Sequence, residues 1–415
     1  MIEDLDPSVV ESTVSQEDIE ESIRKYGRDI YNDFDMLDPT FNENFDGILD
    51  DLLAKCPVAK SNVGSGYYLV TRQQLVREIA QNWKTFSNAQ GYQPDRPEGL
   101  PYLYPEECDP PIHTAWRQAL NPFMGPAKIA PYEAVIRQDA NTLIDRFVDR
   151  GECDFVTEFG AVLPGWAFFK NVMGVPVDDL DVLVSSVERG TFEPPPDRPK
   201  HFAIIFEYLG EYLKDRAKQE SKGEMVDMIA AGVMYDDGTM ASYEDRLSVL
   251  VDMVFGGIAT TTYVMADGMR YLAENPDQRQ LLLDDPSLIP RAVEEFARVY
   301  PPVVQLGRCL TRDVELGGRQ MKQGDFVMMC YAGSSRDPRV IEEPAKVDIT
   351  RKVALHSAFG MGPHRCIGAN LARLELVATY EEWLKRIPHF QVKSGTEPIY
   401  ETGILRSMHN LHLVW

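Results

Sequence analysis

The longest proline-free stretch of the chain constrains the fold most, because it predicts one long helix. No proline occurs between Pro199 and Pro276. Within that stretch, Ser242 followed by an acid at Asp245 is typical of a helix N-cap. A helix from Ser242 to Asn275 would be about 50 Å long at a rise of 1.5 Å per residue. This is long enough to cross a whole domain.

The middle of this predicted helix contains residues that should weaken it. The segment VFGGIATTTY, from Val254 to Tyr263, has two adjacent glycines and three consecutive threonines. Glycine and β-branched residues are poor helix formers. A functional reason is therefore needed for their presence there.

The composition is that of an acidic globular protein. The 415 residues are 44% hydrophobic, and Lys+Arg 42 against Asp+Glu 65 give a formal net charge of −23. Such an acidic excess argues against non-specific binding to nucleic acid or to an anionic membrane. The polar, acidic N-terminus lacks the features of a secretory signal, and we expect no window apolar enough to span a membrane. We therefore expect a cytoplasmic protein.

The order of the patterns predicts a mainly α fold with a minor β region. Residues 1–30 are expected to be an acidic, loosely held lead, and residues 31–415 a single domain. Residues 66–71 form a plausible strand, and residues 303–350 alternate in a way that predicts small antiparallel hairpins. A last strong helix is expected from Gly368 to Lys385.

Two proline-rich segments interrupt the helical patterns. Residues 90–111 are dense in proline and aromatic residues, and residues 190–199 contain a second proline cluster. Long loops inside compact domains often act as lids or binding loops. We expect both segments to line a ligand pocket.

Among six scattered cysteines, Cys366 stands in a distinctive setting. There is no CxxC pair, so neither a zinc site nor a disulfide framework is indicated. Cys366 lies in the segment FGMGPHRCIG, residues 359–368, a glycine-rich loop that opens into a helix. Backbone amides at a helix N-terminus lower the pKa of a thiol and stabilise a thiolate, which is a good soft metal ligand.

This ten-residue segment resembles the haem-binding loop of cytochrome P450, the family of haem-thiolate monooxygenases. The resemblance implies that Phe359 packs on the loop, that the glycines lie flat against the porphyrin, and that Cys366 is the axial ligand of haem b iron. It covers the chain from about Phe34 to Trp415 and implies a fold whose long central helix crosses the haem. FDMLDP near the start and GILRSMHNLHLVW at the end resemble the soluble bacterial camphor-hydroxylating type.

Three further residues resemble the ionic cluster that supports the haem's proximal side in this family. Glu295 and Arg298 are three residues apart, which puts both side chains on one face of a helix. Alone they would be an ordinary surface ion pair. Beside the cysteine loop, the resemblance implies a buried structural pair, with Arg351 as the third member.

Four residues resemble the family's donors to the haem propionates. His113 and Arg117 lie one helical turn apart, and the resemblance adds Arg308 and His364. Four cationic or hydrogen-bonding groups suit two buried carboxylates. His356 is expected to pack or cap locally.

The weakened helix resembles the family's oxygen-binding groove. Glycines such as Gly256 would let the helix open beside the haem, and Thr260 would occupy the position of the proton-handling alcohol. The preceding position, where the family normally has an acid, is Ala259. Either protons arrive through water and Thr260, or Ala259 is an introduced substitution. In both cases we expect slow turnover limited by proton delivery, because Asp252 is about 10 Å away by helix rise.

The resemblance also implies a substrate, an oxidant and a partner. Dioxygen would be the co-substrate, and a [2Fe-2S] ferredoxin with its reductase would supply two electrons, docking near Arg117 and Arg365. The substrate would be a small hydrophobic molecule, a terpenoid or norisoprenoid such as camphor. The alternatives are a haem-based binding or sensor protein and a peroxide-using haem enzyme. The implied substrate contacts are Tyr92, Tyr102 or Tyr104, Phe255, Val303 or Val304, Ile404 and Leu405.

Overall fold

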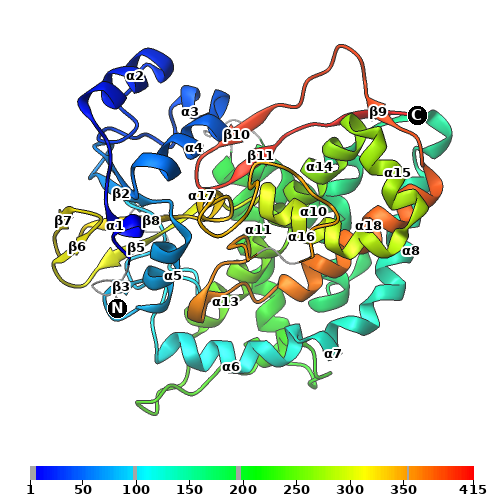
Figure 1. The fold of residues 1–415 in the computed structure, drawn as a ribbon. Coiled ribbons are helices and arrows are strands. Elements are labelled where there is room, and N and C mark those ends of the chain that lie inside the picture. The colour runs from blue at the N-terminus through cyan, green and yellow to red at the C-terminus, as the bar shows by residue number, and fades with distance from the viewer. Residues whose placement is uncertain (1–5, 97–100, 193–197, 353–354) are drawn as a thin grey trace.

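A computed structural model describes residues 6–96, 101–192, 198–352 and 355–415 of the chain. Helices dominate it, and the strands gather mainly on the side that carries the N-terminal segments (Figure 1). The first helices are α1 (Pro7–Val10), α2 (Gln16–Tyr26), α3 (Pro39–Glu43), α4 (Phe45–Lys55), α5 (Gln73–Gln81), α6 (Ile112–Met124), α7 (Pro126–Ile129), α8 (Glu133–Asp145) and α9 (Val162–Trp166). They are followed by α10 (Leu180–Phe192), α11 (Arg198–Arg216), α12 (Met225–Ala231), α13 (Tyr243–Gly257), α14 (Ala259–Glu274), α15 (Pro276–Asp284), α16 (Ile289–Val299), α17 (Tyr331–Ser334) and α18 (Ala369–Arg386).

The predicted long helix is present, but it is divided into α13 and α14. Its start was predicted correctly: the Ser242 hydroxyl accepts from the Asp245 amide at 3.0 Å, and the Asp245 carboxylate accepts from the Ser242 amide at 2.9 Å. Ile258 separates the two helices, directly after the glycine pair. The prediction of one continuous helix is therefore corrected at the place where the glycines and threonines weaken it.

This helical pair also corrects the expectation about membrane spans. Residues 243–274 are long and apolar enough to cross a membrane by length and composition, with a mean hydropathy of 1.5 in one window. Of that window, 78% is buried inside the protein, and the described part of the chain has no second helix of this kind. The apolar composition therefore serves the core.

The strands form four small sheets. The largest has the order β1-β2-β8-β5-β3, in which β2 pairs in parallel with β8 and the other neighbours are antiparallel. Strand β2 lies within the predicted residues 66–71, and β5 to β8 lie within the predicted hairpin region. The strands are β1 (Val58–Ser61), β2 (Tyr67–Val70), β3 (Phe86–Ser87), β4 (Glu152–Asp154), β5 (Gln305–Leu310), β6 (Val314–Leu316), β7 (Arg319–Met321), β8 (Phe326–Cys330), β9 (Gln391–Val392), β10 (Tyr400–Thr402), β11 (Arg406–Met408) and β12 (His412–Val414).

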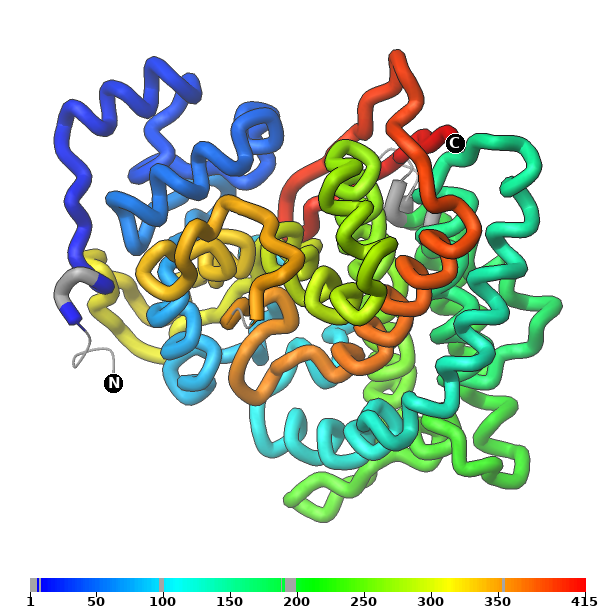
Figure 2. The backbone as a smooth tube through the Cα atoms, turned by 45° about the vertical axis from the view of Figure 1, so that its right-hand side comes forward, coloured from blue at the N-terminus to red at the C-terminus, as the bar shows by residue number. Residues whose placement is uncertain are grey.

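The N-terminal segment is more ordered than the expected loose lead. Ser15 caps α2, and Tyr26 at its end is buried, with its hydroxyl donating to Asp51 of α4 at 2.7 Å. Figures 1 and 2 place α2, α3 and α4 at one side of the molecule and α7 and α8 at the other. Residues 16–26 therefore form a docked helix.

The described residues form three hydrophobic cores, of which the smallest packs α5 against the largest sheet. The larger core joins α13 and α14 to α8, α16 and α18. A second core, which we call the N-terminal core, is built on α4, β1, β2 and the segment around Met36, with Val304 and Met328 from the later strands. The long helical pair thus lies within the larger core.

Candidate active site

The loop before α18 holds Cys366 in a fixed backbone turn. The Cys366 amide donates to the Phe359 carbonyl at 2.8 Å, which closes the loop. Gly360 and Gly362 have φ of +66° and +68°, the region that favours glycine, and a Cβ at Gly362 would collide with the backbone of Ala80. The glycine pattern predicted from the sequence is therefore a requirement of this turn.

The Cys366 side chain is exposed, in contrast to the other five cysteines, which are buried. It nevertheless lies deep among protein atoms, and this burial raises the pKa of the thiol, while the Gly368 amide and the nearby Arg117 oppose the shift. The Gly368 amide thus lowers the pKa of the thiol, as the sequence predicts, but burial outweighs it. A bound metal cation would supply the missing stabilisation of the thiolate.

Two histidines, one in α6 and one in the cysteine loop itself, each have a ring nitrogen without a hydrogen-bond partner among the described residues. The rings of His113, in α6, and His364 lie 4.0 Å apart between centroids. The Nε2 atom of each is buried and has no hydrogen-bond partner among the described residues. Burial lowers the pKa of His113 to about 4, with Arg117 and Arg308 adding to the effect, and burial also lowers the pKa of His364. Both rings are therefore neutral at pH 7.

The four predicted propionate donors are thus brought together around one place. Arg308 bonds to the Gly307 carbonyl at 2.7 Å, and Arg117 makes no hydrogen bond or ion pair within the described residues. Unpartnered buried nitrogens and guanidinium groups are the donors that two carboxylates require. Together with the exposed thiol, these residues fit an iron porphyrin.

The predicted ionic cluster is also assembled. Arg298 and Glu295 pair at 2.7 Å with side chains 0% and 2% exposed, and Arg351 reaches the same carboxylate at 3.2 Å. Arg298 also donates to the carbonyls of Pro344 and Lys346. Burial opposes ionisation of Glu295, but the bonds from Arg298 and from a backbone amide outweigh it and lower its pKa. This cluster is a charged and fully bonded support.

His356 behaves as a local structural residue, as predicted. It lies 3.2 Å from a Glu294 oxygen and accepts from the Ala358 amide at 3.3 Å. Arg373 completes this second cluster, pairing with Glu294 and lying 4.3 Å from the centroid of the Phe359 ring. Phe359 therefore packs on the loop, as the sequence indicates.

The helical break presents the residues predicted for oxygen chemistry. Gly256 is exposed, and a Cβ added there would meet nothing within 4 Å. The Thr260 hydroxyl donates to the Gly256 carbonyl at 2.9 Å, and Ala259 adds no polar atom. Thr262 is buried and donates to Gly160, so it packs as predicted. Open space therefore lies beside Gly256, one turn before Thr260.

Some predicted substrate contacts gather at a cavity of about 560 Å³. Ile404 and Leu405 line it together with Phe202 of α11. Val303 forms a bridge with Leu405, and Phe255 packs edge-on against Phe202 with centroids 5.2 Å apart. These residues form one apolar region that extends from the surface toward α13.

The three tyrosines predicted as substrate contacts lie in different surroundings. The Tyr102 ring is 40% exposed and lies beneath Arg96 at 4.3 Å, whereas Tyr104 packs against the larger core. The Tyr92 ring is half-buried, and its carbonyl accepts from the Gly307 amide. The structure therefore does not bring the Tyr102 ring to the apolar region. Residues 97–100 and 193–197, which complete the two expected lids, lie outside the described residues.

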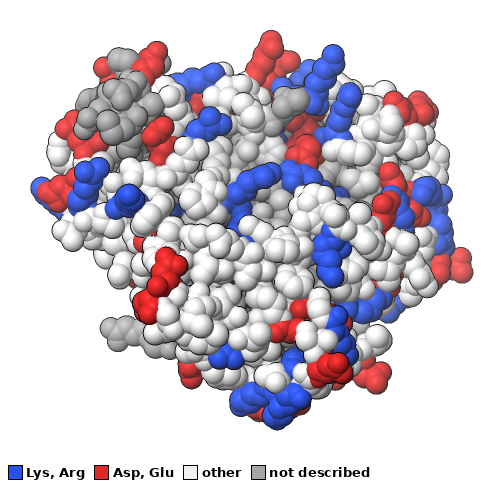
Figure 3. Space-filling view, turned by 90° about the horizontal axis from the view of Figure 1, so that it is seen from below, with Lys and Arg blue, Asp and Glu red and all other residues white. Residues whose placement is uncertain are grey.

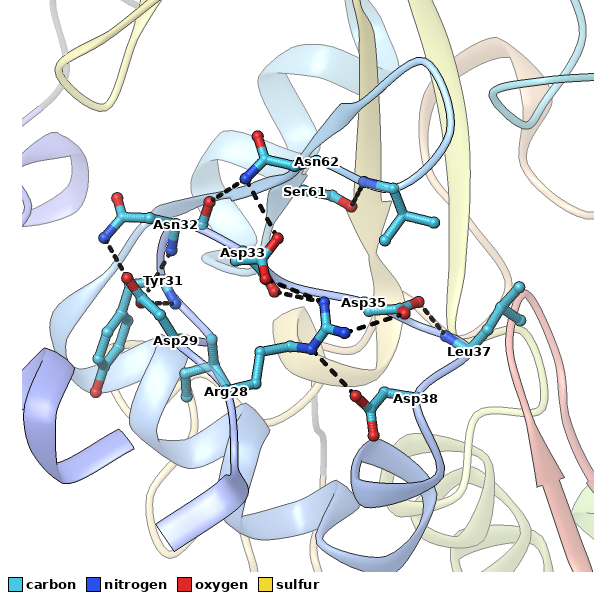
Figure 4. Close-up of polar contacts among 12 residues, drawn as sticks. Arg28, Asp29, Tyr31, Asn32, Asp33, Asp35, Leu37, Asp38, Ser61 and Asn62 are labelled. Atoms are coloured by element: carbon cyan, nitrogen blue, oxygen red, sulfur yellow. Dashed lines mark hydrogen bonds and ion pairs between the residues drawn. The ribbon is translucent and has the colours of Figure 1, made fainter. Parts of the chain in front are cut away.

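One rim of this cavity is fixed by a single arginine. Arg28 contacts Asp33, Asp35 and Asp38 at 3.3, 3.7 and 3.1 Å (Figure 4). Asp35 is itself a lining residue of the cavity. This rim is therefore held by ion pairs rather than by secondary structure.

One pair of residues was missed by the sequence analysis. The carboxyl of Glu106, in the first proline-rich loop, is hydrogen-bonded to that of Asp252 in α13. The adjacent acids in PEECDPP were the only sequence signal, and a pair of surface acids would look the same.

Comparisons with known proteins agree with this geometry. A family model described as Cytochrome P450 matches residues 191–413. The Steroid C26-monooxygenase of Mycobacterium tuberculosis is 32% identical over 85% of this chain and 95% of its own. Cytochrome P450-terp of a Pseudomonas species is 28% identical, covering 86% and 90%. The crystal structure of CYP101J2 superimposes with a TM-score of 0.79 at 29% identity, covering 89% and 92%.

Proposed function

Because this chain belongs to the cytochrome P450 family and is a monooxygenase, we propose that it uses dioxygen to hydroxylate a small hydrophobic substrate of terpenoid type. Its resident cofactor would be haem b, which supplies the iron that activates oxygen. The observation that carries this proposal is the exposed Cys366 thiol in a closed glycine turn, beside two neutral histidines with unpartnered Nε2 atoms.

The protein residues would bind the cofactor from two sides. Cys366 would be the iron ligand, and His113, Arg117, Arg308 and His364 would donate to the propionates. The cluster around Glu295 would hold the segment that precedes the cysteine loop, because it bonds the backbone of residues 335–348.

Thr260 would handle the proton on the opposite side. Its Oγ1 holds a hydrogen that now points to the Gly256 carbonyl, and rotation about χ1 would redirect it toward the open space. Ala259 cannot relay a proton, so we expect proton delivery to limit turnover. Ala259→Asp should raise the dioxygen-dependent rate and reduce its solvent isotope effect, and an unchanged rate would contradict this part of the proposal.

The substrate class is proposed from the apolar region and from the relatives. Phe202, Phe255, Ile404 and Leu405 provide hydrophobic walls, which suit a compact apolar molecule. Both a terpene-linked and a steroid-linked name occur among the relatives. A screen of camphor and other small terpenoids against a steroid, read as the haem spin-state change, would separate the two classes.

The electron donor is proposed to be a small acidic [2Fe-2S] ferredoxin. Arg365 is exposed beside Cys366. On the face seen from below Figure 1, Lys and Arg side chains gather around a central hollow, although Asp and Glu occur elsewhere on it (Figure 3). Local positive charge steers an acidic partner even in an acidic protein. Arg365→Ala should slow reduction by ferredoxin and leave substrate affinity unchanged.

Two measurements test the assignment as a whole. The reduced carbon monoxide complex should show the thiolate-type absorption band, and Cys366→Ala should abolish it. Product should form with ferredoxin, reductase and dioxygen. Because Ala259 removes the usual acid, a peroxide-using enzyme is the second candidate, and it would form product with hydrogen peroxide but not with ferredoxin. A sensor would form product with neither.

A further inference from the structure

With Ala259 in place, the proton that reaches Thr260 needs another source, and the spacing along α13 identifies one. Side chains four residues apart lie on the same face of a helix. Asp252, Gly256 and Thr260 have this spacing. Of the other acids of α13 and α14, Asp245, Asp267 and Glu274 fall outside this row, and Glu244 lies in it but two turns before Asp252, exposed in the first turn of α13.

The first proline-rich loop is docked along this face of α13. The Tyr104 amide donates to the Ser248 hydroxyl at 2.8 Å, and that hydroxyl donates to the Tyr102 carbonyl. Ser248 lies one turn before Asp252, in the same row. The docking therefore brings the next residues of the loop, which include Glu106, to Asp252.

Glu106 meets Asp252 with both its backbone and its side chain. The Glu106 carboxyl lies within hydrogen-bonding reach of the Asp252 carboxyl, and the Glu106 amide also faces it. An ionised carboxylate only accepts hydrogen bonds, so two bonded carboxyl groups must hold at least one proton between them. Asp252 is buried and Glu106 half-buried.

The surroundings keep this proton in place near neutral pH. Burial raises the pKa of Glu106 to about 7, with Arg308 opposing and Glu107 adding to the shift. Burial, followed by Glu106 and Glu107, raises the pKa of Asp252. Glu107 is itself paired with Arg96 at 3.0 Å. The remaining charged or titratable groups that act on the pair are Arg117 of α6, Arg308 of β5, Tyr92, Cys108, Tyr331 of α17 and Cys366.

Solvent can approach the loop from its outer side. A surface cavity of about 470 Å³ is lined by Ser87, Gln90 and Arg96, among others. Arg96 reaches inward to Glu107, and the Asn88 side-chain amide donates to the Glu106 carbonyl at 2.9 Å. The backbone of Glu106 thus lies next to residues of a solvent-facing cavity, while its carboxyl faces Asp252.

We propose that Glu106 and Asp252 jointly hold the proton that is delivered to Thr260 Oγ1, in place of an acid at position 259. This inference rests on the proposed monooxygenase function. Insertion of one oxygen atom and release of the other as water consumes two electrons from the redox partner and two protons. The pair passes on one proton at a time and regains it from solvent, so neither residue is consumed. Asp252 and Thr260 are about 12 Å apart by helix rise, so a chain of several water molecules would carry the proton between them.

The first test detects the proton itself and needs no turnover. The infrared spectrum of the substrate-free holoenzyme should contain a C=O band of a protonated carboxyl group that disappears as the pH is raised through about 7. A second band, from Asp267, whose pKa burial raises to about 6, should persist in every variant below. Glu106→Gln and Asp252→Asn should each remove this band. Glu244→Gln, an exposed acid in the first turn of α13, is the matched control and should retain it. A band that titrates unchanged in both variants would overturn the proposal.

The second test asks whether the proton is used. Both variants should lower dioxygen-dependent product formation about tenfold or more, since positioned proton transfer contributes roughly 10²–10⁴-fold. Their solvent isotope effects should increase. The reduced carbon monoxide band, and the substrate affinity read from the spin-state change, should stay within about twofold of the wild type.

Two other results would contradict the proposed role of Glu106 and Asp252. A loss of substrate affinity equal to the loss of product would make the pair a substrate contact and overturn the proposal. A weakened carbon monoxide band would make it a structural element, with the same consequence. If the wild type forms no product, the proposed function fails, and the infrared band still decides whether the pair holds the proton.

Discussion

Glu295 in α16 and Asp252 in α13 are both buried acids, but their partners carry opposite kinds of charge. Glu295 is bound by two arginines, Arg298 and Arg351, and by a backbone amide. Asp252 is bound by another carboxyl, that of Glu106. The first arrangement is fully ionised and the second is held together by a proton. One side of the site is therefore built to stay fixed, and the other is built to change its protonation state.

The largest expected effect comes from breaking the ionised side. Arg298→Ala should leave Glu295 buried with only the half-buried Arg351, which typically destabilises a protein by about 3–5 kcal/mol. Denaturant unfolding, followed by far-UV circular dichroism, measures the loss. Arg291→Ala, an exposed arginine on the same helix, is the control and should change stability by less than about 0.5 kcal/mol. Equal losses in the two variants would contradict a buried support.

The next largest effect is on stability, and it should differ in sign between Gly256 and Gly257, the adjacent glycines at the end of α13. A Cβ at Gly257 would lie 3.2 Å from the buried Phe168 ring, whereas one at Gly256 would meet nothing within 4 Å. Gly257→Ala should destabilise by about 1–3 kcal/mol through overpacking. In the haem-free protein, Gly256→Ala should stabilise by up to about 1 kcal/mol, because alanine favours helix and no protein atom lies near this position. Thermal unfolding of the two variants would show shifts of opposite sign if the open space beside Gly256 is real.

A smaller effect, on the pH dependence of stability, tests whether Glu106 is protonated in the folded protein. The pKa of Glu106 is raised from 4.5 to about 7, so the folded state holds its proton more tightly than the unfolded state does. Stability should therefore fall as the pH rises from about 4.5 to 7, by on the order of 1 kcal/mol after screening. Glu106→Gln should flatten this part of the stability profile. A wild-type profile that rises with pH in this window because of Glu106 would contradict the shared proton.

The smallest expected effect concerns Glu294, next to the cysteine loop. Its contribution to stability should rise with pH, whereas that of Glu106 should fall. Burial opposes ionisation of Glu294, but His356 and Arg373 outweigh it and lower its pKa from 4.5 to about 2. Its contribution should be present above pH 4.5 and lost as the pH falls toward 2. Glu294→Gln should reduce this acid sensitivity by a few tenths of a kcal/mol, since the side chain is 38% exposed. Urea unfolding at several acidic pH values measures it.

The contacts that the sequence predicted join residues close together in the chain, whereas those that it missed join residues far apart in the chain. Glu295 and Arg298 lie three residues apart on one helix, and the Cys366 turn is a continuous ten-residue segment, so local patterns were enough. The contact between Glu106 and Asp252 joins segments far apart in the chain, and no periodicity marks it. The break at Ile258 was foreshadowed by the glycines, but a weak helix former gives a tendency and not a boundary.

The effect of burial on the Cys366 thiol was missed for a related reason. A helix N-terminus and a turn are visible in the sequence, whereas the depth at which Cys366 lies is a property of the whole fold. Likewise, both Tyr102 and Tyr104 are aromatic residues of one loop, and only tertiary packing turns Tyr104 toward the core and leaves Tyr102 beneath Arg96.

The separate N-terminal core has a consequence for how such a protein diversifies. Met36 and Ile404, on the rim of the cavity of about 560 Å³, pack in that core, whereas α18, which follows the cysteine loop, belongs to the larger core. Substitutions at Met36 and Ile404 should therefore alter the lining of this cavity with little change in the packing around α18. The lining of this cavity can therefore vary independently of the larger core. Arg28, which pairs with Asp35 at the cavity rim, is the residue to leave unchanged.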